Sequence, residues 1–110
     1  MAYDQHLAAR IRTILGGQPG VVERPMFGGL TFMVDGNMGC GVIGDDLMVR
    51  VGPDAFDDAV SRPHARVMDF TGKPSRGAVY VAPAGVATDG ALAEWVGRGA
   101  AYAGSLPRKA

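Results

Sequence analysis

Residues 21–43, VVERPMFGGLTFMVDGNMGCGVI, determine the fold that we expect for this chain. Their first part is apolar and predicts a strand over 21–34, bent or bulged at Pro25 and at Gly28-Gly29. Asp35-Gly36 follows between two apolar runs, which is a strong hairpin signal. A second strand over 38–43 is therefore expected to return beside the first.

The segments on either side supply helices and further strands. Leu7, Ile11 and Leu15 have the spacing of one buried helical face, which predicts a first helix that Asp4 caps and that ends at Gly16-Gly17. The middle of the chain predicts a strand over 47–51, a short helix after Pro53, and strands over 67–70 and 78–82. The last helix is capped by Thr88 and carries Leu92, Trp95, Val96, Ala100 and Tyr102. Its core is placed over 89–96, because Gly97 and Gly99 weaken the rest.

The predicted order is α-β-β-β-α-β-β-α. Strands that are grouped in hairpins, with helices between the groups, predict a two-layer α+β fold whose antiparallel sheet carries its helices mainly on one face. The length of 110 residues is that of one domain, which we assign to residues 1–110.

Composition excludes several classes of protein. No apolar run approaches the roughly 18 residues of a membrane span, and the N-terminus lacks the pattern of a secretory signal. The single cysteine, Cys40, excludes an internal disulfide or a Cys-pair zinc site. Eleven basic residues balance eleven acidic ones, so the phosphate-binding charge of a strong DNA-binding domain is missing. We expect a cytoplasmic domain without cofactor or metal.

Several short motifs resemble those of one known family. Met26-Phe27-Gly28-Gly29 before an apolar strand, Gly72-Lys73-Pro74 before the last strand, and Trp95 in the last helix occur in this order. Together they resemble the TfoX/Sxy N-terminal domain family over nearly the whole chain. The resemblance implies a fold of the secretion-chaperone-like type. It also implies a role in transcriptional regulation of competence, because named members promote DNA-uptake genes together with the cyclic-AMP receptor protein. The C-terminal domain of those regulators is absent here, so we expect a stand-alone domain.

The same motifs also have structural interpretations. The MFGG element, residues 26–29, is interpreted first as a bend that defines the fold and second as a binding surface at that bend. Gly72-Lys73-Pro74 is not a phosphate-binding loop, because the upstream glycine is missing and a strand follows. Cys40 is interpreted as a small buried residue, since no motif places a base beside it. No set of residues supports catalysis, so we do not expect an enzyme.

The sequence therefore favours a non-enzymatic regulatory domain that binds protein partners of unknown identity. Met48 and Arg50 share the parity that faces away from the expected helices, and they are candidates for an exposed interaction surface. A homodimer is also expected, in which the acidic residues of 45–58 pair with the basic residues of 62–76 in a second copy. The alternative is a small-ligand or weak nucleic-acid binder that uses the cations of this basic segment, which are Arg62, Arg66, Lys73 and Arg76.

Overall fold

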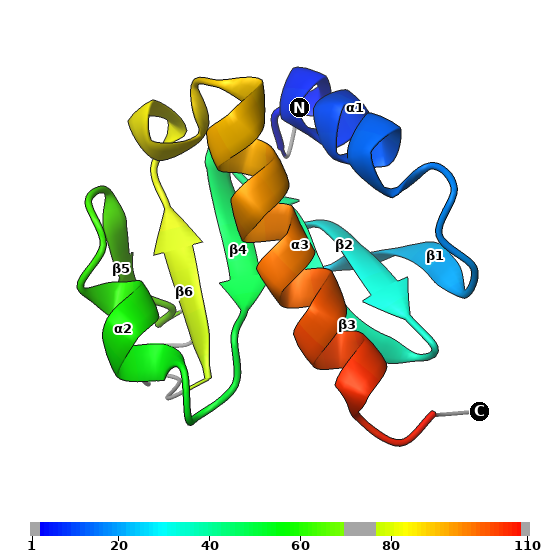
Figure 1. The fold of residues 1–110 in the computed structure, drawn as a ribbon. Helices are drawn as coiled ribbons and strands as arrows, with labels where there is room; N and C mark the ends of the chain where they lie inside the picture. The colour runs from blue at the N-terminus through cyan, green and yellow to red at the C-terminus, as the bar shows by residue number, and fades with distance from the viewer. Residues whose placement is uncertain (1–2, 70–76, 109–110) are drawn as a thin grey trace.

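The computed structural model describes residues 3–69 and 77–108 (Figure 1). Gly72, Lys73, Pro74 and Arg76 lie outside these described residues. In chain order the elements are α1 (Gln5–Leu15), β1 (Val21–Met26), β2 (Gly29–Val34), β3 (Asn37–Ile43), β4 (Asp46–Arg50), α2 (Phe56–Val60), β5 (Ala65–Val67), β6 (Ala78–Val81), the 3-10 helix η1 (Pro83–Val86) and α3 (Asp89–Ser105).

All six strands join one antiparallel sheet in the order β1-β2-β3-β4-β6-β5. The expected hairpin at Asp35-Gly36 is confirmed, and both residues have positive φ, as a two-residue type I′ turn requires. The single strand expected over 21–34 is wrong, because a second turn of this kind divides it into β1 and β2. In that turn Phe27 has φ 57° and Gly28 has φ 72°, and Met26 pairs with Gly29.

The helices and one face of the sheet enclose the main core, which confirms the α+β class with helices on one face. In Figure 1, α3 runs diagonally across the front of the sheet, with α1 and α2 on the same side. Leu7 and Ile11 of α1, Phe56 of α2 and Leu92 and Val96 of α3 all belong to this core. The expected caps are present, since the Asp4 carboxylate accepts from backbone N–H groups of α1 and the Thr88 hydroxyl accepts from Ala91 N–H of α3.

Helix α3 continues nine residues beyond the core expected for it, to Ser105. Gly97 and Gly99, which were expected to weaken it, do not end the helix. Gly99 packs so closely on β3 that a Cβ there would overlap the carbonyl oxygen of Gly39, whereas Gly97 has nothing within 4 Å of the same position. Gly99 therefore lets the helix approach the sheet, at a small cost in helix propensity.

The opposite, open face of the sheet holds a second apolar cluster. Its buried members are Met48, Met68, Ala78 and Tyr80, and Phe27, Met38 and Ile43 pack against them. Met48 lies on the face expected for it, but it is 0% exposed. The expectation that Met48 offers an exposed surface is therefore wrong, and a polar substitution there would report on folding rather than on an interface. We call this set of seven residues the methionine cluster.

No helix within residues 3–69 and 77–108 has the length and apolar character needed to cross a lipid bilayer.

Candidate functional site

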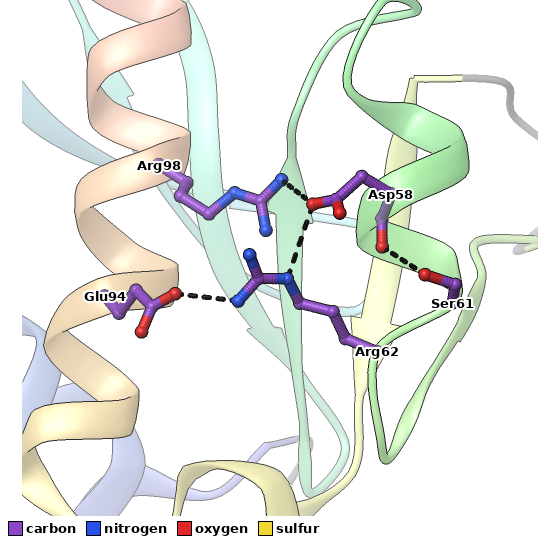
Figure 2. Close-up of polar contacts among 5 residues, drawn as sticks. All are labelled: Asp58, Ser61, Arg62, Glu94 and Arg98. Carbon is purple, nitrogen blue, oxygen red and sulfur yellow. Dashed lines mark hydrogen bonds and ion pairs between the residues drawn. The ribbon is translucent and has the colours of Figure 1, made fainter.

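Arg62, the first of the expected surface cations, lies in a network of charges between α2 and α3. Figure 2 shows Asp58 accepting from both Arg62, at 3.4 Å, and Arg98, at 3.3 Å, while Arg62 also donates to Glu94 at 2.8 Å. Both guanidinium groups lie over the ring of Trp95, at 5.9 Å and 5.2 Å from its centre. Trp95 is buried, and both arginines of this network are ion-paired with carboxylates of the same chain.

Asp58→Asn tests how much this network of ion pairs stabilises the packing of α2 against α3. The substitution keeps the side-chain size but removes the charge shared by the two arginines, and Nη1 of Arg98 already lacks a hydrogen-bond partner among the described residues. Because Asp58 is 65% exposed, we expect the Tm to fall by only about 2–4 °C. Thermal melting at low and high salt checks this, with the exposed neighbour Asp57→Asn as the control. An equal fall in Tm in both variants would contradict a stabilising role for the network.

Arg66 is engaged on the other face of the sheet. Its guanidinium forms a 2.7 Å ion pair with Asp46 and lies 4.9 Å from the centre of the Tyr80 ring. Burial, with the nearby charge of Asp69, raises the pKa of the Tyr80 hydroxyl. Two ion pairs between the acidic and basic segments thus form within one chain, at Asp58–Arg62 and Asp46–Arg66.

A groove on the open face brings together residues that the sequence analysis had treated separately. It has a volume of about 580 Å³ and lies beside the edge strand β1. Apolar side chains and three arginines line it. The lining residues are Val22, Arg24, Met26, Phe27, Met33, Met38, Arg50 and Arg108, with Asp35 and Gly36 at the β2–β3 turn and Gly20 just before β1. We call this site the arginine groove.

The three arginines reach the groove from distant parts of the sequence. Arg24 comes from β1 and Arg50 from the end of β4, where its guanidinium lies 5.4 Å from the centre of the Tyr102 ring. Arg108 follows α3, and the buried Asn37 side chain donates to the carbonyl of Pro107 at 3.0 Å, which fixes this segment beside the β2–β3 turn. Phe27 and Met38 belong to both the groove and the methionine cluster, so the groove lies directly beside this buried cluster.

The groove arginines differ from the other described arginines in their partners. Arg10, Arg12, Arg62, Arg66 and Arg98 each form an ion pair with a carboxylate. Among residues 3–69 and 77–108, no carboxylate lies within ion-pair distance of Arg24, Arg50 or Arg108. The uncompensated positive charge of the described chain is therefore concentrated in the arginine groove.

The residues of the MFGG element divide between a turn in the sheet and the lining of the groove. Gly28 and Gly29 make the turn and the close contact with β3, whereas Met26 and Phe27 line the arginine groove. The sequence analysis selected Arg50 but missed Arg24 and Arg108. Arg24 could have been found, because it alternates with Val22 and Met26 on one strand, and alternate side chains of a strand face the same side of the sheet. Arg108 carries no such signal, since only the contact between Asn37 and Pro107 places it.

Cys40 is a buried residue, as expected. It is 1% exposed within β3, and this burial raises the pKa of its thiol to about 12. Such a thiol is almost entirely protonated at pH 8 and is a poor nucleophile. Among the described residues, no three His, Cys, Asp or Glu side chains gather in a way that could hold a metal ion.

We expect a thiol reagent at pH 8 to label Cys40 only when the chain unfolds. Labelling in native buffer should be slower by several orders of magnitude than in denaturant, because the thiolate forms only after opening. Mass spectrometry over a time course measures both rates. Rapid labelling without denaturant would show that β3 opens locally.

The fold and its groove define a small α+β domain with helices on one sheet face and a basic, partly apolar groove on the other. A sequence model of the TfoX N-terminal domain matches residues 13–103, and the chain belongs to this family. Comparison with curated proteins and with solved structures finds no match. Arg24 and Arg50 lie inside the matched region, and Arg108 lies beyond it.

Proposed function

We propose that this chain is a non-enzymatic regulatory domain that acts by binding another protein at the arginine groove. One observation carries the proposal: the three described arginines that lack an acidic partner all line the same groove. Arginine beside partly exposed methionine and aromatic side chains, such as Met26, Phe27 and Met38, is typical of protein-binding surfaces, because it combines charge with adaptable apolar contact. Membership of the TfoX N-terminal domain family supports transcriptional regulation, including that of competence, as the cellular context.

The alternative site in the basic segment 62–76 has less support. Its described arginines, Arg62 and Arg66, are each bound to carboxylates of the same chain. They also lie on opposite faces of the sheet, one beside α3 and one over Tyr80. Releasing them would cost the existing ion pairs, and nucleic acid would then meet few cations. We therefore propose that this chain does not bind DNA strongly.

The test compares gene expression in the native host. A strain that lacks the chain is complemented with the wild type, with Arg24→Glu/Arg108→Glu, or with Arg10→Glu as a control outside the groove. We expect the wild type and the control to restore the transcript profile, and the groove variant to leave it as in the deletion strain. Circular dichroism must show that both variants fold. Full restoration by the folded groove variant would overturn the proposed site.

A further inference from the structure

The edge strand β1 forms one side of the arginine groove. Among residues 3–69 and 77–108, strand β1 pairs only with β2, and Val22, Arg24 and Met26 are the alternate residues of β1 that face the groove. Val22 is 58% exposed, which makes it the more exposed of the two large apolar side chains left open to solvent among the described residues. A segment lying beside β1 would therefore contact the groove through every second side chain.

The alternation of hydrogen bonds between β1 and β2 shows which backbone groups of β1 point away from the sheet. The N–H of Asp35 donates to the carbonyl of Gly20 at 3.0 Å, and Met26 pairs with Gly29 across a two-residue turn. Even-numbered residues of β1 therefore exchange hydrogen bonds with β2, and odd-numbered residues direct theirs away from the sheet. Val21 and Glu23 offer an N–H and a carbonyl each, whereas Pro25 offers a carbonyl alone. Among the described residues, no backbone group meets this edge.

We propose that the arginine groove binds an acidic, partly apolar peptide segment of another protein as an added strand along β1. This inference rests on the proposed function and specifies the partner. Carboxylates on the groove-facing side of the segment would meet Arg24, Arg50 and Arg108, and apolar side chains between them would contact Val22 and Met26. Backbone hydrogen bonds supply affinity in this mode of binding, and the alternate side chains supply specificity.

A second copy of this chain is a poorer occupant of the same edge. Joining two β1 strands antiparallel would make one continuous sheet, with both grooves on the same face. Six unpaired arginines would then lie together beside only two copies of Asp35. Like charges gathered in this way oppose association, whereas an acidic strand relieves the repulsion.

Single-stranded nucleic acid also fits the groove less well. Such sites stack successive bases on several aromatic side chains along a basic track. Phe27 is the single aromatic residue among the described residues that line the groove, and the other described apolar side chains there are valine and methionine. Three arginines would make few phosphate contacts.

The experiment uses the full chain and a fluorescent peptide, Thr-Glu-Thr-Leu-Thr-Glu-Thr, whose Glu and Leu side chains share one face when it is extended. Anisotropy titration at low salt should show saturable binding. We expect Arg24→Gln/Arg50→Gln and Arg24→Gln/Arg108→Gln each to weaken binding about tenfold, because each partly exposed charge pair contributes roughly threefold. Arg10→Gln, outside the groove, should remain within about twofold of wild type. Melting curves establish that every variant folds.

Two peptide changes separate strand addition from charge attraction alone. Methylation of the threonine amide nitrogens keeps all charges but removes the donors that would face β1, and it should weaken binding at least about tenfold. Replacement of both Glu by Lys should abolish binding. Equal binding of the methylated and unmethylated peptides would overturn the added strand.

Three further results would also overturn the inference. The first is no saturable binding of the acidic peptide up to about 1 mM. The second is tighter binding of a ten-nucleotide oligo-dT that the groove variants also lose. The third is self-association in sedimentation equilibrium that the peptide cannot dissociate, which would assign the edge to a second copy. Loss of regulation in the groove variant, without peptide binding, would leave the proposed function standing and remove only this inference.

Discussion

Gly29→Val is expected to lower the free energy of unfolding by about 3 kcal/mol. Gly29 is the first residue of β2, and a Cβ there would overlap the carbonyl oxygen of Val42 on β3. Backbone cannot rotate away as a flexible side chain can, so the two strands must separate where the ladder between them begins. Urea unfolding followed by circular dichroism measures the loss.

Gly17→Val is the matched control for this substitution. Gly17 follows α1, and nothing lies within 4 Å of the place where an added Cβ would sit. The unfolding midpoint of the Gly17→Val variant should therefore remain close to that of the wild type. A Gly29→Val protein that unfolds like the wild type but loses regulation would show that Gly29 belongs to a binding surface. The close contact with Val42 would then not determine stability.

Gly99→Ala and Gly97→Ala are expected to change stability in opposite directions. The added methyl at Gly99 would overlap the Gly39 carbonyl oxygen and force α3 away from the sheet, at a cost of about 2 kcal/mol even after the gain in helix propensity. The same methyl at Gly97 enters open space, so the better propensity of alanine should raise stability by about 0.5–1 kcal/mol.

The pair serves as its own control, because the substitution, the helix and the measurement are the same. Chemical unfolding of the three proteins under one set of conditions gives both differences. Destabilisation by Gly97→Ala of the same size as by Gly99→Ala would contradict the close approach between α3 and β3. It would indicate that this part of the helix needs flexibility instead.

The features that could be predicted from sequence depend on neighbours in the chain. The hairpin at Asp35-Gly36 and the caps Asp4 and Thr88 follow from local backbone chemistry, and the fold class follows from their order. The turn at Phe27-Gly28 escaped prediction because its first residue is not one that favours positive φ. The interpretation of a continuous strand was reasonable for those residues alone.

Other features depend on residues that are far apart in the sequence. Gly99 weakens its own helix, and only its contact with Gly39 explains why α3 continues past it. The open face shows the same limit, since alternation placed Met48 there but could not show that it is buried. The candidate site was only partly predictable for this reason: Arg50 had the right parity, whereas Arg108 reaches the groove through a contact between Asn37 and Pro107.

Among residues 3–69 and 77–108, unpaired positive and unpaired negative side chains lie in different parts of the fold, and their separation contributes an electric dipole. Positive charge remains uncompensated at the arginine groove, while Asp45 at the β3–β4 turn and Asp54 and Asp57 near α2 are exposed and have no ion pair among the described residues. An anionic molecule that approaches at low ionic strength therefore experiences a torque as well as an attraction, and meets the groove more often than random collision would allow. Salt at physiological concentration shortens the range of this field to about 8 Å. The rate of encounter should thus depend on ionic strength although the net charge is zero.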